Sequence, residues 1–371
     1  MEKIHIVTGA FGFSGSYLVK ALLKEGKKVL ATDTSGRLNN KERISYCKSI
    51  DLDLAHPRLS LVSADLSSRE SLRQLFKDIG SIGIVYHTAS LYNYSASLSL
   101  LRKVNVQGTA NLLAELPRDI DQFIHWSTCG VFGKPIKKGV LAGLPFTETS
   151  ESPKTMSPRA KRPAVTPLVN EYSVSKWEQE QMLWKKCKEE GFPLTVIRPA
   201  PIYGPGSKYG HGGIIVAVAT GLLPFIPVAS KHSKTISVHV EDLAHFALYV
   251  SGKKECIGED YNCVDSTDIS YYDFIHFIAR VLGKEIIDVS HFPMGLMRAI
   301  TFSVATFINV LNLKKYYPQL SIVETQSAKY IGSSYRVSNE KSKSIGFEYK
   351  YEDVKVGIKD TVSWFSNQGW I

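Results

Sequence analysis

The sequence predicts an α/β fold built on a doubly wound parallel sheet, with a smaller and mainly C-terminal second part. Short runs of β-branched residues alternate with helix-like stretches through the first half of the chain. Such alternation implies right-handed crossovers and a sheet that is covered by helices on both faces. The length of 371 residues, of which 44% are hydrophobic, is enough for about two domains with a substantial core.

The expected elements follow this alternation along the chain. In the first half we expect strands at 4–10, 27–33, 59–65, 82–89 and 122–128, with helices at 14–24, 69–77 and 98–116. Pro, Ser, Thr, Lys and Arg dominate 134–170, which predicts a long surface loop. Later we expect a helix at 171–188, a strand within 193–206, a strand at 259–264, a helix at 270–283, an apolar stretch at 292–313 and a final helix.

The composition excludes several functional classes. The cysteines show neither CxxC nor Cys/His spacing, so we expect free thiols and neither a disulfide framework nor a metal site; they are Cys47, Cys129, Cys187, Cys256 and Cys263. The formal net charge is +10, but the cations are dispersed in short pairs. This favours a weak preference for anionic ligands or membrane surfaces, and it argues against nucleic-acid binding, which needs a basic stripe interleaved with aromatic residues.

Residues 1–12 lack the order of a secretory signal, so a cytoplasmic location is expected.

Glycines recur at the junction between the first strand and the first helix. Gly9, Gly12 and Gly15 let the backbone approach a pyrophosphate, whose charge the free N–H groups and the helix dipole stabilise. Asp33 ends the second strand, where its carboxylate can accept the hydroxyls of an adenosine ribose and repel a 2′-phosphate. NAD is therefore preferred over NADP, although Arg37 could bind that phosphate. The alternative interpretations are a plain tight turn for the glycines and a solvated acid at the strand end for Asp33.

Tyr172 and Lys176 are four residues apart and share one face of a helix. A tyrosine is a poor base at neutral pH, but an ammonium one turn away favours the phenolate and lowers the pKa. Such a pair can move a proton at an alcohol or a carbonyl. Taken alone, the same spacing is more often a solvated helix face.

The motifs occur in a fixed order, and together they resemble the extended short-chain dehydrogenase/reductase superfamily over residues 1 to about 250. They are TGxxGxxG, Asp33, Asp65 with Leu66, the HTAS run at 87–90, Asn105 to Thr109, Ser127 with Thr128, Val131 to Gly133, YxxxK, Arg198 with Pro199, and Tyr203 to Gly206. The resemblance implies an NAD-binding Rossmann domain at 1–197 with 232–257, and a substrate-binding domain at 198–231 with 258–371. It also implies a homodimer.

The resemblance assigns roles to these positions. Tyr172 would be the acid/base, Lys176 would bind the nicotinamide ribose, and Thr128 would hydrogen-bond the substrate oxygen. The implied cofactor contacts are Gly9, Phe11, Gly12, Phe13 and Gly15 at the pyrophosphate, Asp33 and Arg37 at the ribose, Asp65 and Leu66 at the adenine, Thr88, Ala89 and Ser90 beside the fourth strand, Asn105, Ser127, Tyr172 and Lys176, with Pro199 and Ile202 at the carboxamide. Phe132 departs from the tyrosine of the Val-Tyr-Gly motif, which removes a hydroxyl near the substrate.

The tail at 237–250, 258–284 and 345–365 resembles the 3β-hydroxysteroid dehydrogenase and sterol-4-carboxylate 3-dehydrogenase branch. That branch implies oxidation of a secondary alcohol by NAD, or the reverse reduction, on a lipophilic substrate. Nucleotide-sugar epimerases and dehydratases share the front motifs. They would have to hold a diphosphate, for which Lys154, Arg159, Lys161 and Arg162 are the candidate cations, and a solvated lid is the alternative interpretation of that loop. A non-catalytic cofactor-binding sensor is the third reading.

The apolar stretch at 292–313 is long enough to span a bilayer, but Arg298, Asn309 and Asn312 make it a poor hydrocarbon segment. A wall around a lipophilic pocket or an interfacial membrane contact fits better, and an ordinary buried helix is the alternative.

Overall fold

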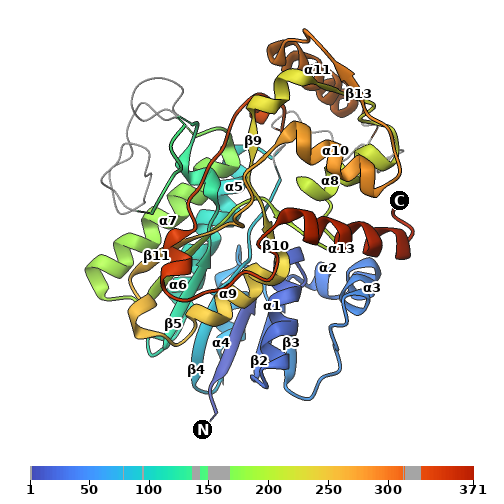
Figure 1. Ribbon diagram of the computed structural model, residues 1–371. Helices are drawn as coiled ribbons and strands as arrows, with labels where there is room; N and C mark the ends of the chain where they lie inside the picture. Colours follow the sequence, from blue (N-terminus) through green and yellow to red (C-terminus); the bar gives the residue numbers. More distant parts are fainter. Residues whose placement is uncertain are drawn as a thin grey trace.

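A seven-stranded parallel sheet forms the centre of the computed structural model (Figure 1). The structure describes residues 2–77, 79–93, 96–135, 143–148, 168–311, 313 and 327–371. In sheet order the strands are β3 (Leu59–Ser63), β2 (Val29–Asp33), β1 (Ile4–Thr8), β4 (Ile82–His87), β5 (Gln122–Trp126), β6 (Leu194–Pro199) and β11 (Glu259–Cys263). The strand order reverses between β1 and β4, and in parallel α/β sheets ligands bind at the carboxyl edge at such a point. The predicted doubly wound fold is confirmed.

Helices cover both faces of this sheet (Figure 1). On one face α1 (Phe13–Lys24) packs against α9 (Val240–Val250), and on the other lie α4 (Arg69–Phe76), α6 (Gly108–Glu115) and α7 (Glu171–Glu190). The strands β2, β4 and β5 are therefore buried along their whole length, which explains why most of their residues are apolar. The edge strand β3, by contrast, is largely exposed.

Two helical regions differ from the prediction. The helix expected at 98–116 consists of α5 (Leu98–Leu101), a π-helical segment (Arg102–Gln107) and α6. After β2 the chain forms α2 (Ser35–Leu38) and α3 (Lys41–Ser49), where no helix was expected. The reason is that α3 is rich in charge and buries only Cys47, so no apolar stripe marks it in the sequence.

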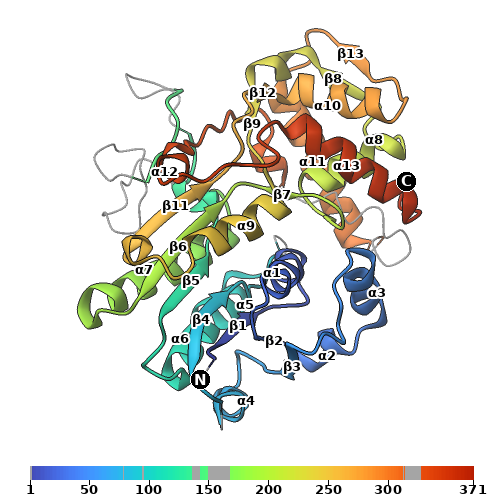
Figure 2. The same ribbon diagram turned by 60° about the horizontal axis from the view of Figure 1, so that its bottom comes forward.

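A second lobe with its own apolar core lies beyond the carboxyl edge of the sheet (Figures 1 and 2). It contains α8 (His211–Ala219), α10 (Tyr271–Val281), α11 (Met294–Val310), α13 (Val354–Asn367) and the paired strands β8 (Phe225–Pro227) and β13 (Ile287–Val289). The short pairs β7 (Ile202–Tyr203) with β10 (Val238–His239) and β9 (Lys234–Thr235) with β12 (Ile269–Ser270) lead into it, and α12 (Glu340–Ser344) packs against β11. The expected domain limits stay a prediction, and β11 of the central sheet lies beyond the limit at residue 257.

The two parts contact each other through α13. The indole of Trp364 donates from Nε1 to the carbonyl oxygen of Ser49 at the end of α3, at 3.2 Å, and its ring packs edge-on against Tyr46. Among the described residues, no helix combines the length and the apolar character that crossing a bilayer requires.

Candidate active site

The glycine turn between β1 and α1 is too tight for side chains. Gly9 has a φ of +67°, and a Cβ placed on it would lie 2.7 Å from the Cα atom of Ala89. A Cβ on Gly15 would lie 2.2 Å from the carbonyl oxygen of Gly9. Gly12 begins α1 without a side-chain cap, and no acidic residue lies in the first turn. The helix N-terminus therefore offers free N–H groups and a positive dipole end to a pyrophosphate.

Asp33 is held beside this turn. One carboxylate oxygen accepts from the backbone N–H of Phe11 at 3.1 Å, the other accepts from Thr34 at 2.9 Å, and Arg37 lies 4.0 Å away. Burial raises the pKa of Asp33, while Arg37 and the two N–H groups lower it. A fixed acid at the end of β2, next to a turn that only glycine fits, suits the adenosine half of NAD.

Asp65 and Leu66 lie at the end of the third strand. The carboxylate of Asp65 accepts from the N–H and the hydroxyl of Ser67, and the carbonyl oxygen of Leu66 accepts from Asn111 Nδ2 at 2.9 Å. Both residues are thus placed by local turns next to α6. Their predicted contact with adenine stays a prediction.

The segment after β4 is tied to β1 and to α7. The hydroxyl of Thr88 donates to the Thr8 carbonyl oxygen at 2.7 Å, and the N–H of Ala89 donates to the Thr8 hydroxyl at 3.3 Å. Asn105 in the π-helical segment accepts from the N–H of Leu91 at 2.7 Å and donates to the Ser175 hydroxyl at 3.0 Å. Asn105 therefore fixes the segment 88–91 relative to the helix that carries Tyr172.

Tyr172 and Lys176 are both buried on α7. The helix begins at Asn170, whose side chain accepts from the Ser173 N–H, and it ends at Gly191 in the left-handed conformation. The side chain of Lys176 is 1% exposed, and its Nζ donates to Gln179 Oε1 at 2.5 Å. Burial lowers the pKa of Lys176 to about 7, and Glu180 opposes this shift.

The pKa of Tyr172 differs from the expectation. The sequence predicted a lowered value, but burial raises the pKa of Tyr172, and the Ser90 hydroxyl only partly opposes that shift. Loss of water around the phenol disfavours the phenolate. The ring of Tyr92 packs edge-on against it with the centroids 5.0 Å apart.

Thr128 and Ser127 follow β5 and have different partners. The hydroxyl of Thr128 accepts from the Gly130 N–H at 3.1 Å and caps the 3₁₀ turn Cys129–Phe132. Its own O–H proton remains available to a substrate oxygen. The Ser127 hydroxyl donates to the buried carboxylate of Glu180, so its predicted cofactor contact stays a prediction.

Pro199 ends β6, and Ile202 begins the next strand, β7. Their contact with the carboxamide stays a prediction. Phe132, which was expected near the substrate, is fully buried and stacks on Phe146 with the centroids 5.1 Å apart. The hydroxyl that Phe132 lacks would therefore lie in the core beside Arg198, and not in an exposed part of the site.

A buried ion network behind the site was not predicted from the sequence. The guanidinium of Arg198 on β6 lies 3.0 Å from Glu180 on α7 and 2.7 Å from Asp260 on β11, and all three side chains are fully buried. One signal was available, since Glu180 follows Lys176 by four residues on the same helix face. This network clamps α7 against the sheet.

Several residues that the sequence analysis named lie elsewhere in the chain. The cations Lys154, Arg159, Lys161 and Arg162 lie outside the described residues, as do Asn312 and most of the loop 134–170. In the part of the chain that the structure describes, no group of His, Cys, Asp or Glu could hold a metal ion.

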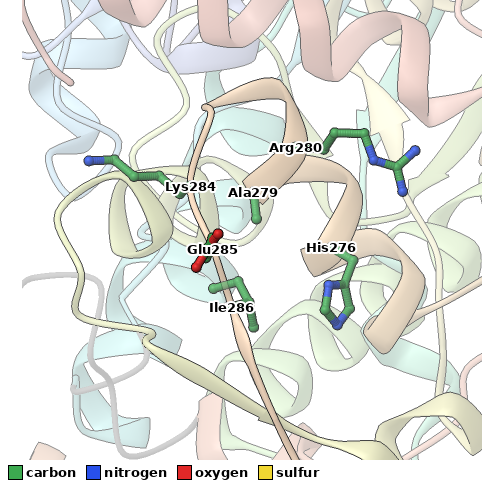
Figure 3. A pocket seen from close by; sticks show the side chains of 6 residues that line it. All are labelled: His276, Ala279, Arg280, Lys284, Glu285 and Ile286. Atoms are coloured by element: carbon green, nitrogen blue, oxygen red, sulfur yellow. The ribbon is translucent and has the colours of Figure 1, made fainter.

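A surface groove of about 360 Å³ lies on α10 and the turn to β13 (Figure 3). Two of its cations, Arg280 and Lys284, point in opposite directions. The groove therefore lacks convergent groups for an anionic ligand.

The fold and this set of residues define an extended short-chain dehydrogenase/reductase. The sequence pattern of the NAD dependent epimerase/dehydratase family matches residues 5–263, and the chain belongs to this family. NAD is its cofactor.

Several relatives are similar over most of their length. The chain is 24% identical to the 3beta-hydroxysteroid-dehydrogenase/decarboxylase isoform 1 of Arabidopsis thaliana, over 99% of this chain and 80% of the relative. It is 27% identical to the short-chain dehydrogenase/reductase family 42E member 1 of Danio rerio, over 99% and 89%. It is also 23% identical to the UDP-glucose 4-epimerase of Vibrio cholerae, over 76% and 77%.

Solved structures share the fold. The UDP-glucose 4-epimerase of Thermotoga maritima, determined with UDP-glucose, superimposes with a TM-score of 0.70 at 19% identity over 98% of this chain and 99% of the other. The UDP-glucose 4-epimerase of Thermus thermophilus in complex with NAD gives a TM-score of 0.66 at 19% identity, with the same coverage.

Proposed function

We propose that this protein is an NAD-dependent dehydrogenase/reductase that interconverts a secondary alcohol and a ketone on a lipophilic, sterol-like substrate. The observation that carries the proposal is the pairing of Tyr172 and Lys176 on α7, both buried, beside a glycine turn shaped for a dinucleotide. The likeness to the plant 3beta-hydroxysteroid-dehydrogenase/decarboxylase along nearly the whole chain supports the substrate class.

The proposed chemistry needs three side chains. Bound NAD supplies the group that accepts a hydride from the carbinol carbon or returns it to the carbonyl carbon. Tyr172 takes the proton of the substrate hydroxyl during oxidation and donates it during reduction. Thr128 donates its remaining O–H proton to the same oxygen, and the ammonium form of Lys176 favours the phenolate against the effect of burial.

Aromatic rings beside Tyr172 suit a flat apolar substrate. The ring of Tyr92 contacts Tyr172, and the ring of Tyr209 contacts Tyr92 with the centroids 5.7 Å apart. Tyr92 is 40% and Tyr209 is 43% exposed, so both rings have surface left for a ligand. Such rings bury apolar area with little loss of conformational entropy.

The exposed side of α11 extends the proposal to a membrane surface. Its outward residues are apolar, with Phe307 at 59% and Val310 at 76% exposure, and only Ala305 and Ile308 are buried. The net charge of +10 complements anionic lipid headgroups. We propose that α11 lies on the bilayer surface, where a water-insoluble alcohol can enter from the lipid.

A nucleotide-sugar epimerase is the second candidate, because UDP-glucose 4-epimerases share both sequence and fold with this chain. A panel of 3β-hydroxysteroids, other apolar alcohols, UDP-glucose and dTDP-glucose separates the two. We expect NADH formation with hydroxysteroids. Turnover of a nucleotide sugar with no activity on any apolar alcohol would overturn the proposal, and no turnover of either class would favour a non-catalytic sensor.

A further inference from the structure

A buried polar chain runs behind Lys176 toward β1. Gln179, one turn beyond Lys176, accepts from the ammonium through Oε1 and donates from Nε2 to the hydroxyl of Thr109 at 2.5 Å. The Thr109 hydroxyl also lies 2.8 Å from His87 Nε2, and His87 Nδ1 lies 2.8 Å from the Thr8 hydroxyl. The side chains of Gln179, Thr109 and His87 are all fully buried.

The orientation of the Gln179 amide follows from the donors available. The ammonium of Lys176 can only donate, so the amide oxygen of Gln179 faces it and the amide nitrogen faces Thr109 and His87. The Thr109 hydroxyl accepts from this nitrogen and donates to the carbonyl oxygen of Asn105 at 2.7 Å. His87 Nε2 lies 3.3 Å from the same amide nitrogen.

We propose that Gln179 is a positioning residue for Lys176: its amide oxygen, held by Thr109 and His87, orients the ammonium for the nicotinamide ribose. Lys176 has three N–H donors, and the bond to Gln179 uses one of them. Two donors remain for the cofactor and the phenol. The inference rests on the proposed role of Lys176 at the ribose, and it adds the residue that orients this lysine.

Among the described groups that face Lys176, Gln179 is the hydrogen-bond acceptor that contacts the ammonium directly. On α7 itself, the carboxylate of Glu180 stabilises the ammonium from a distance while pairing with Arg198. His87 on β4 and His125 on β5 face it from the sheet. Burial lowers the pKa of His87 to about 3 and that of His125 well below its usual value, so both are neutral.

NADH binding without any substrate tests the inference. We expect Gln179→Met to raise the Kd for NADH about tenfold at pH 7, because a hydrogen bond to a buried charged group is lost. Gln179→Glu keeps an oxygen acceptor and adds a charge that raises the pKa of Lys176. The pH at which NADH binding weakens should therefore rise in Gln179→Glu and fall in Gln179→Met.

Gln122→Met is the matched control, because Gln122 is also a fully buried glutamine that donates to a threonine, Thr195, but it lies at the start of β5. We expect a similar loss of stability in a thermal melt with the Kd for NADH unchanged. Equal NADH affinity and equal pH dependence in the wild type and both Gln179 variants would overturn the inference.

Lys176→Met should weaken NADH binding at least as much as Gln179→Met, and no effect of Lys176→Met would overturn both the role of Lys176 and the inference. Absence of turnover on apolar alcohols, with the expected changes in NADH binding, would overturn only the proposed function.

Discussion

Beneath Tyr172 and Lys176, buried polar side chains of β1, β4, α6 and α7 are joined by hydrogen bonds, and those of α7, β6 and β11 are joined by ion pairs, whereas on α11 apolar side chains are exposed to solvent. In the first region, buried side chains hold charged groups and hydrogen bonds in one arrangement. The second leaves apolar area uncovered, which a lipid surface or an apolar ligand would cover. We therefore expect catalysis to depend on the buried polar side chains, and the choice of substrate to depend on the second lobe.

Removing the phenol hydroxyl should have the largest effect. In Tyr172→Phe we expect turnover to fall by about three orders of magnitude, because proton transfer at the substrate oxygen is lost. The Kd for NADH should change less than about twofold, since the ring and the neighbouring lysine remain. Tyr86→Phe, which removes another buried hydroxyl on β4, is the control, and equal turnover of wild type and Tyr172→Phe would refute the role.

Breaking the ion network of Arg198, Glu180 and Asp260 should destabilise the fold. Asp260→Asn removes one carboxylate from fully buried Arg198, and we expect the free energy of unfolding to fall by about 3 kcal/mol. Chemical denaturation measures it. Asp268→Asn, in an ion pair whose aspartate is 65% exposed, should change stability little. Equal stability of both variants would show that the pair of Arg198 with Asp260 does not stabilise the fold.

Charges on the exposed side of α11 should weaken membrane binding and leave the buried polar region unchanged. Phe307→Asp with Val310→Asp should weaken binding to anionic vesicles about tenfold, because apolar area is lost and negative charge is added, while the melting temperature stays the same. Cosedimentation measures the binding. Ile287→Asp, at a 65% exposed residue of β13, controls for charge alone. Unchanged vesicle binding in the double variant would remove α11 from the membrane contact.

The smallest effect is expected at the aromatic rings. Tyr209→Leu should raise KM for a hydroxysteroid about threefold with kcat nearly unchanged, because one ring contact is lost. Tyr272→Leu, on α10 and bonded to Asp288, is the control. A fall in kcat without a change in KM would place Tyr209 in the chemistry and not in substrate binding.

The sheet could be predicted from sequence because its inner strands are buried on both faces and read as apolar runs. The glycine turn, Asp33, Tyr172 and Lys176 could be predicted because each depends on short spacing. The polar chain through His87, Thr109 and Gln179 could not, since its members are separated by up to 92 residues and meet only after the strands pair. The pKa of Tyr172 was predicted in the wrong direction, because burial is a property of the packed site and not of the spacing to Lys176.

Transfer of an isotope tests the central claim most directly. A 3β-hydroxysteroid that carries deuterium on its carbinol carbon is incubated with the protein and NAD, and the reduced cofactor is analysed by mass spectrometry. We expect NADH with one deuterium, formed together with the ketone. Unlabelled cofactor, or recovery of the alcohol unchanged while a nucleotide sugar is epimerised, would contradict it.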